Sequence, residues 1–241
     1  SDGTPLPSCL DRQLRLANSS AKIGAVGAKQ VAGENHRDLL EVGIRATRSA
    51  RRVPEIEPDE LDQGQLDDRQ DVLGVGSVAM LVRREALEAI GGLDPALGPY
   101  GDGLETSRRL WAGGWRVLVE PRAVVAHARA SLSAPTRATF SRRRAAQLYN
   151  SVLAAPLLLA PLLWLSYILA APLRAFGRLV TKDAHHVLPE LAGAGRFIVR
   201  LPALLRARRR LNRATTVSGS VLRTLEDSSA DVWRAKRQLR R

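Results

Sequence analysis

The residue types best suited to ligand recognition are concentrated in residues 73–127. Gly76 and Ser77 belong to a Gly-Val-Gly-Ser run, and glycines allow the backbone to approach a bound molecule closely. Arg108 and Arg109 follow, and guanidinium groups suit a phosphate or an acidic acceptor. At helical spacing the same two arginines equally suit ion pairs with nearby carboxylates. This part of the sequence therefore indicates either an anion-binding site or a charged helix face.

Two carboxylates and a tryptophan accompany these arginines. Asp102 and Glu105 lie three residues apart, within one turn of a helix that we expect to begin near Leu104. Asp102 could simply cap that helix. Trp111 offers an aromatic face on which a sugar ring could stack. The residues taken singly leave ligand-binding and structural roles open.

Six short sequence motifs, taken in their order along the chain, favour a ligand-binding role for these residues. They are Gly74-Val75-Gly76-Ser77, Arg83-Arg84-Glu85-Ala86-Leu87, Gly91-Gly92-Leu93-Asp94, Tyr100-Gly101-Asp102-Gly103, Gly113-Gly114-Trp115 and Glu120-Pro121-Arg122-Ala123-Val124-Val125-Ala126-His127. In this order and spacing they resemble the C-terminal half of the catalytic domain of the family 2 inverting glycosyltransferases. The resemblance implies a GT-A type, Rossmann-like fold and transfer of a sugar from a nucleotide-sugar donor.

The resemblance also implies a catalytic base. In that family the second residue of an acidic pair accepts the proton of the attacking hydroxyl, a role worth about 10² to 10⁴ in rate. Alignment on Arg109 and on the glycine turn at residues 113–114 puts Asp102 at the first acidic position and Gly103 at the second. Asp102 is therefore the expected base and Glu105 the next choice. We expect Asp94, at the end of its Gly-Gly-Leu-Asp signal, to cap a turn.

A divalent cation, Mg²⁺ or Mn²⁺, is the cofactor that the resemblance implies, because it would neutralise the departing diphosphate. Asp2 begins a run similar to the end of the Asp-x-Asp region of the family, and His127 stands where the family has a ligand near the metal. A purely structural role for His127 at a strand end is the alternative.

The resemblance extends beyond the six signals. Residues 41–43, 57–65 and 67 are similar to a segment of large multi-spanning membrane members of the family from high-GC bacteria, and residues 2–7 resemble the end of the Asp-x-Asp region of the family. It implies a donor-binding half before Ser1, so we expect a partial GT-A domain that is inactive alone. The implied acceptor is a lipid-linked or polysaccharide component of the cell envelope, with the catalytic domain on the cytoplasmic side of the cell membrane.

Residues 1–140 are predicted to form an α/β domain with a mostly parallel or mixed sheet. Helical spacing covers residues 10–19, 84–90 and 105–112, and apolar strands are expected at 23–31, 71–82 and 116–119, the last ended by Pro121. The acidic residues 33–70 are predicted to be a surface excursion between strands. Helices between apolar strands favour an α/β architecture.

Residues 141–183 are predicted to be membrane-associated. Residues 152–173 are free of charge and long enough to span a bilayer as a helix, but Pro156, Pro161 and Pro172 interrupt them and arginines flank both sides. A simple span, a re-entrant or interfacial segment, and a buried soluble hairpin all remain possible. Residues 184–241 are predicted to be a basic amphipathic helical tail. Within it, residues 187–205 fit an interfacial helix better than a second membrane-spanning helix.

Charge is distributed unevenly along the 241 residues. The chain has 37 Lys and Arg against 24 Asp and Glu, and residues 141–241 hold 19 of the basic but only 5 of the acidic residues. An anionic partner would therefore meet the C-terminal part, either in the transferase or in a non-enzymatic basic module. Because that part has few aromatic side chains for base stacking, we expect anionic lipid and no nucleic acid. The single Cys9 excludes an intramolecular disulfide and a Cys-based zinc site.

Overall fold

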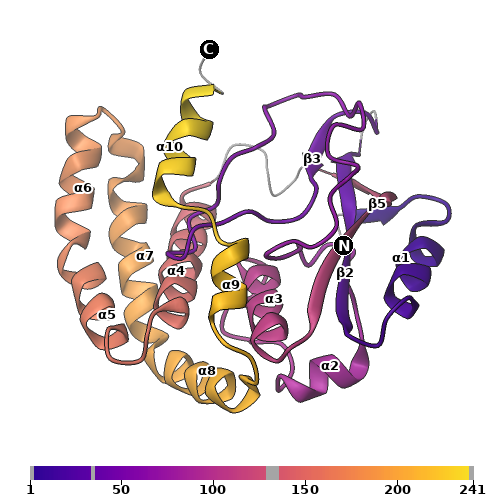
Figure 1. Ribbon diagram of the computed structural model, residues 1–241. Coiled ribbons are helices and arrows are strands. Elements are labelled where there is room, and N and C mark those ends of the chain that lie inside the picture. Colours follow the sequence, from indigo (N-terminus) through magenta and orange to yellow (C-terminus); the bar gives the residue numbers. More distant parts are fainter. Residues whose placement is uncertain (1–2, 34–35, 129–135, 239–241) are drawn as a thin grey trace.

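The computed structural model describes residues 3–33, 36–128 and 136–238. A mixed sheet with its covering helices and a bundle of helices lie side by side (Figure 1). The sheet and its helices come from the first half of the chain, the bundle from the second. The predicted α/β class is confirmed.

The sheet has the strand order β1-β5-β2-β3, with β4 also paired to β2. The strands are β1 (Gly3–Pro5), β2 (Ile23–Ala32), β3 (Leu39–Glu41), β4 (Leu81–Val82) and β5 (Arg116–His127). Only β2 and β5 run parallel, while the other pairs are antiparallel. Every residue of β2 is buried, as expected for a central strand covered on both faces.

Strand β5 runs past Pro121, contrary to the prediction that this proline ends it. The register with β2 shifts between Ala28, which pairs with Glu120, and Lys29, which pairs with Val124. This bulge leaves Pro121 outside the β2 ladder, so its missing N–H costs no hydrogen bond there. The strand continues to His127.

The predicted strand at residues 71–82 is mostly wrong. Only β4 is regular, while Asp71 and Gly74 make single bridges to Leu118 and Ile44. Val72 and Val75 nevertheless belong to the main core cluster. The apolar pattern thus predicted correctly that these residues are buried, but not their secondary structure. The glycines at residues 74 and 76 belong to a loop that packs on a helix.

Residues 36–70, which were predicted to lie on the surface between strands, contribute side chains to the core of the α/β unit. Leu39 and Val42 are in the main core cluster. Lys29 of β2, 4% exposed, pairs with Asp62 at 2.8 Å and with Asp67 at 2.5 Å. The acidic residues of this segment thus neutralise a buried lysine of the central strand.

Three helices flank the sheet: α1 (Cys9–Asn18), α2 (Arg84–Ala89) and α3 (Asp102–Ala112). In α3 every residue from Gly103 to Ala112 is buried. Asp94, in the turn before α3, accepts hydrogen bonds from the Ala96 N–H (3.1 Å) and the Tyr149 hydroxyl (2.6 Å). Asp94 therefore has the structural role that the sequence predicted, and it also ties the turn to the bundle.

The bundle consists of α4 (Arg137–Ala154), α5 (Ala160–Leu169), α6 (Ala171–Val180), a short 3₁₀ turn (Ala184–His186), α7 (Val187–Val199) and α8 (Leu201–Ala214). Helix α4 crosses the predicted boundary at residue 140. Glu190 of α7, 2% exposed, joins the helices by pairing with Arg144 of α4 (2.9 Å) and Arg174 of α6 (2.8 Å).

The apolar residues 152–173 are divided among α4, α5 and α6, because the chain breaks at Pro156 and restarts with prolines in the first turns of α5 and α6. Among the described residues no single helix is long and apolar enough for a membrane crossing; α5 and α6 together, bent by 42°, meet the length and composition required.

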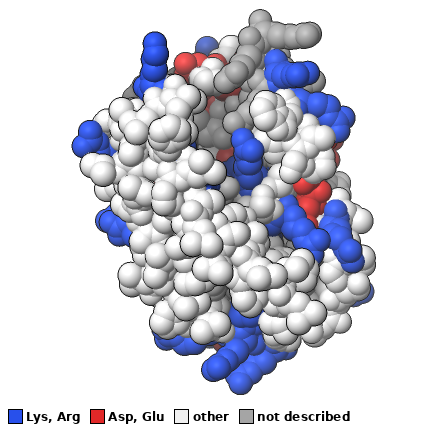
Figure 2. Space-filling model, turned by 90° about the vertical axis from the view of Figure 1, so that its left-hand side faces the viewer, with Lys and Arg blue, Asp and Glu red and all other residues white. Residues whose placement is uncertain are grey.

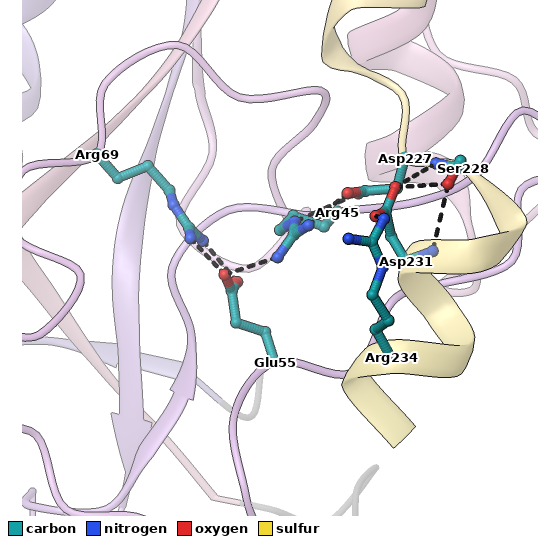
Figure 3. A network of polar contacts seen from close by, with 7 residues as sticks. All are labelled: Arg45, Glu55, Arg69, Asp227, Ser228, Asp231 and Arg234. Carbon is teal, nitrogen blue, oxygen red and sulfur yellow. Dashed lines mark hydrogen bonds and ion pairs between the residues drawn. The ribbon is translucent and has the colours of Figure 1, made fainter. Parts of the chain in front are cut away.

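The C-terminal strap, which we define as residues 215–238, returns to the α/β unit. It contains α9 (Ser220–Leu225) and α10 (Ser229–Gln238). Asp227 binds the guanidinium of Arg45 and forms a bridge with Thr47, and Arg45 also pairs with Glu55 at 3.1 Å (Figure 3). The end of the described chain is thus bound to the α/β unit.

Candidate active site

The Gly74–Ser77 loop packs directly on the first turn of α3. The Val75 N–H donates to Ser107 Oγ (3.2 Å), whose hydroxyl donates to the Gly103 carbonyl (2.7 Å). A Cβ atom at Gly103 would lie 2.3 Å from the Val75 carbonyl oxygen and 3.0 Å from the Ser77 nitrogen. Position 103 therefore has no room for a side chain, which explains why the second acidic residue of the expected pair is missing.

Asp102 is the carboxylate that remains at this place. It is half-buried at the N-terminus of α3, next to Gly101, whose φ of 76° is the left-handed conformation that glycine favours. Ser77 Oγ donates to Asp102 Oδ1 at 3.3 Å. The structure thus brings together three predicted site residues, Gly76, Ser77 and Asp102.

Glu41 is a second carboxylate beside this loop, and its role was not predicted from the sequence. Its Oε1 accepts hydrogen bonds from the Gly76 N–H (3.0 Å) and from Gln30 Nε2 (3.3 Å). Its Oε2 pairs with Arg52 Nη1 at 2.5 Å. Glu41 lies 35 residues from Gly76 in the sequence, so no local spacing indicates the contact.

Glu105 and Arg109 form one buried ion pair. Both side chains are 2% exposed, and the guanidinium contacts both carboxylate oxygens, at 2.6 and 2.7 Å. Arg109 also donates to the carbonyls of Ile90 and Gly92, each at 2.7 Å. Burial raises the pKa of Glu105, and Arg109 only partly opposes this effect. The pair anchors α3 to the end of α2, which is the i,i+4 alternative that the sequence left open.

Arg108 and Trp111 also face the interior. Arg108 Nη2 donates to the Thr47 carbonyl (2.9 Å) and pairs with Glu226 of the C-terminal strap (3.0 Å). Trp111, 7% exposed, belongs to the main core cluster, and its indole N–H donates to the Val72 carbonyl (3.0 Å). Its ring thus packs in the core and presents no open face for a sugar.

The two residues proposed as metal ligands are only partly described. His127 is 4% exposed at the end of β5, where its backbone pairs with Gly3 of β1. Asp2 lies outside the described residues. Within residues 3–33, 36–128 and 136–238 no three His, Cys, Asp or Glu side chains are grouped closely enough to hold a metal ion. One imidazole does not fit Mg²⁺ or Mn²⁺, which prefer several oxygen ligands.

A family model described as glycosyltransferase like family 2 matches residues 1–150. The chain belongs to this glycosyltransferase family. The matched residues contain the whole sheet, the Gly74–Ser77 loop and α3, and the mixed sheet agrees with the GT-A, Rossmann-like fold that the resemblance implied. No curated protein matches the chain. As a member of family 2, the chain has the domain of a transferase that acts on glycosyl groups.

Proposed function

We propose that this family 2 chain contributes the acceptor side of an inverting transferase that uses a nucleotide-sugar donor. The proposed acceptor is a polysaccharide or a lipid-linked glycan of the cell envelope. Asp102 is the proposed base: it takes the acceptor hydroxyl proton while that oxygen bonds to the anomeric carbon and the bond to the diphosphate breaks. The supporting observation is that Asp102 lies against Ser77 while Gly103 has no space for an acid.

The Asp102→Asn variant tests the base. The amide cannot accept the proton, so we expect kcat of the complete gene product to fall by about 10² or more. Binding of the nucleotide diphosphate, measured by calorimetry, should change little. Asp71→Asn, which alters a surface ion pair with Arg116, is the matched control and should retain full turnover. Turnover of Asp102→Asn within twofold of the parent enzyme would exclude Asp102 as the base.

Dependence on Mg²⁺ or Mn²⁺ is a separate proposal. It rests on family membership alone, because the described residues do not supply a full set of ligands. Activity of the complete gene product that survives exhaustive chelation would overturn the proposal.

We further propose that the bundle attaches the enzyme to the cytoplasmic face of a membrane containing anionic lipid. Figure 2 shows a broad uncharged surface with Lys and Arg at its edges, on the side formed by α5 and α6. Leu158 is 87% exposed, and Leu162, Leu169 and Leu173 are each at least 65% exposed. Exposed apolar areas of this kind mark contact surfaces, and basic residues near an anionic membrane each contribute about 1 kcal/mol.

Vesicle flotation tests this attachment. We expect the chain to float with vesicles of phosphatidylglycerol and phosphatidylcholine, and Leu158→Ser/Leu162→Ser to reduce the bound fraction severalfold. Leu10→Ser/Leu14→Ser on α1, also exposed, is the control pair and should bind normally. Salt-sensitive binding to DNA without vesicle binding would instead favour the non-enzymatic basic module.

A further inference from the structure

A cavity lies beside α3, where its lining residues fall between Glu105 and Ala112, three to ten positions after Asp102. It has a volume of about 330 Å³ and is enclosed by α3, the end of α4, α8 and the strap helix α9. Ser77 and Asp102 do not line it. The size is within the range of small-molecule sites, about 300 to 1,000 Å³.

The charge of the cavity wall is strongly positive. Five arginines and two glutamates line it, namely Arg48, Arg108, Arg109, Arg208, Arg223, Glu105 and Glu226. The two glutamates are already engaged, Glu105 with Arg109 and Glu226 with Arg108. Three positive charges are left without a carboxylate partner. Like charges gathered around one cavity oppose one another, and an anion bound between them would offset this repulsion.

Arg48 and Arg223 are the accessible members of this group. Both are exposed, and within the described part of the chain neither side chain makes a hydrogen bond or an ion pair. They approach the cavity from different segments, the 45–53 loop and α9. Guanidinium groups that converge from two elements suit the several oxygens of a phosphate group.

The buried arginines behind them are incompletely satisfied. Arg108 has an 8% exposed side chain, and its Nε and Nη1 atoms lack hydrogen-bond partners. Arg208 donates to the carbonyls of Val152, Leu153 and Ala155, but its Nε also lacks a partner. Burial lowers the pKa of Arg108, and the nearby charges of Glu226 and Arg48 act in opposite directions on it. Buried polar groups without partners are rare, so these guanidinium atoms can still donate hydrogen bonds to a molecule in the cavity.

The rest of the wall is apolar and leads to the exposed surface of the bundle. Leu153, Pro156, Leu211 and Leu222 line it. Pro156 is followed directly by Leu157 and Leu158, which are 61% and 87% exposed. The cavity is therefore basic on one side and apolar on the side that continues toward α5.

We propose that this cavity binds a phosphate monoester carried on an apolar chain, that is, a phosphorylated lipid. The phosphate lies between Arg48, Arg108 and Arg223, and the apolar part follows the Pro156 side toward α5. The charge of two on the monoester offsets most of the uncompensated positive charge. Binding at this site requires no sugar transfer, so its test is independent of the proposed reaction.

Calorimetric titration of the purified chain tests the proposal with three soluble probes: dihexanoyl phosphatidic acid, dihexanoyl phosphatidylcholine and inorganic phosphate. We expect phosphatidic acid to bind most tightly and phosphatidylcholine not to bind. Arg48→Gln/Arg223→Gln should weaken phosphatidic acid at least tenfold. Arg15→Gln/Arg122→Gln removes the same charge at two exposed sites outside the cavity and should change binding less than twofold.

The possible outcomes separate the two sources of phosphate. Inorganic phosphate binding as tightly as phosphatidic acid would overturn the lipid assignment. Equal affinities for the two double variants would show binding by overall charge and would overturn the site. Circular dichroism melting curves of all variants verify folding, and because both substituted arginines are exposed we expect unchanged curves.

Discussion

At the scale of single residues, Gly103 decides the chemistry that this site can perform. Alignment alone shows only that an expected acid is missing. The structure adds the cause, because the Val75 carbonyl lies 2.3 Å from the place of a Cβ atom. The loop that brings Ser77 to Asp102 therefore approaches α3 only if residue 103 is glycine. The close packing of this loop on α3 thus accounts both for the missing acid at position 103 and for the contact of Asp102 with Ser77.

The Gly103→Ala variant tests this close approach. In a helix alanine is normally favoured over glycine by about 1 kcal/mol, but the clash with the loop should reverse the sign and destabilise the fold by about 1 to 3 kcal/mol. Urea unfolding measures the change. Gly195→Ala in α7 has nothing within 4 Å of the new methyl and should be neutral or stabilising. Equal effects at the two positions would contradict the steric explanation.

The sequence identified some residues of the site but not all. Gly76, Ser77 and Asp102 were predictable because they lie in short signals with fixed spacing. Glu41 was not, since its contact with Gly76 depends on how β3 joins the sheet. For Arg109 the ion-pair alternative describes what the side chain contacts, and a single sequence gives no means of choosing between such alternatives. Trp111 was expected to stack on a sugar, whereas its ring packs in the core.

At the scale of elements, α3 is the scaffold of the site. All its residues after Asp102 are buried, so it is fixed against the sheet, α2 and the strap together. The Glu105–Arg109 pair is central to this attachment, since Arg109 also holds the two carbonyls that end α2. A charge at a helix surface is usually dispensable, whereas a buried charge that loses its partner is not.

The Arg109→Met variant should therefore be strongly destabilising, by about 3 to 5 kcal/mol, because Glu105 would remain buried without its partner. Thermal and urea unfolding measure the loss. Arg116→Met removes an arginine from the 39% exposed pair with Asp71 and should cost less than about 1 kcal/mol. Similar losses in the two variants would contradict the anchoring role of Arg109.

The elements that the sequence mispredicted share a physical cause. Helices α1, α2 and α3 have local periodicity and were predicted nearly in full. The path of β5 beyond Pro121 depends on a bulge opposite Ala28 and Lys29, and the irregular course of residues 71–80 depends on packing against α3. Both features depend on contacts with residues distant in the sequence, and the local pattern of apolar residues does not predict such contacts.

At the scale of the whole molecule, the charge asymmetry of the sequence corresponds to two structural parts, a near-neutral α/β unit and a basic helical part. The sequence did not indicate that the strap returns to the first part. That contact depends on single ion pairs, Arg45 with Asp227 and Arg108 with Glu226, which leave no periodic signal. Figure 3 shows Arg45 between Glu55 and Asp227, so the network links three separate segments.

This network should make stability depend on pH in the acid range. Burial alone would raise the pKa of Glu55, but Arg69 and Arg45 together outweigh it, so the net shift is downward from 4.5. A carboxyl group with a lower pKa in the folded state stabilises the fold above its unfolded value, and this stabilisation is lost as the pH falls through the folded value. We expect Glu55→Gln to reduce the free energy of unfolding by about 0.5 to 1 kcal/mol near neutral pH.

The difference between the parent chain and Glu55→Gln should shrink as the pH falls below 4.5. Unfolding curves at a series of pH values measure it. Glu57→Gln is the matched control, because Glu57 is exposed and its side chain makes no hydrogen bond or ion pair within the described residues. A constant difference across the whole pH range would show that Glu55 does not act through its charge.

The strap has a further consequence for the kinetics of folding. Arg45 and Asp227 are 182 residues apart, so their contact closes a loop that includes the bundle and α3. Contacts of such long range form late, because the entropy of loop closure must be overcome before they stabilise anything. During synthesis the arginines of the 45–53 loop emerge from the ribosome long before Asp227 and Glu226. The nascent α/β unit must therefore wait, with Arg108 unpaired, until the last helices have been made.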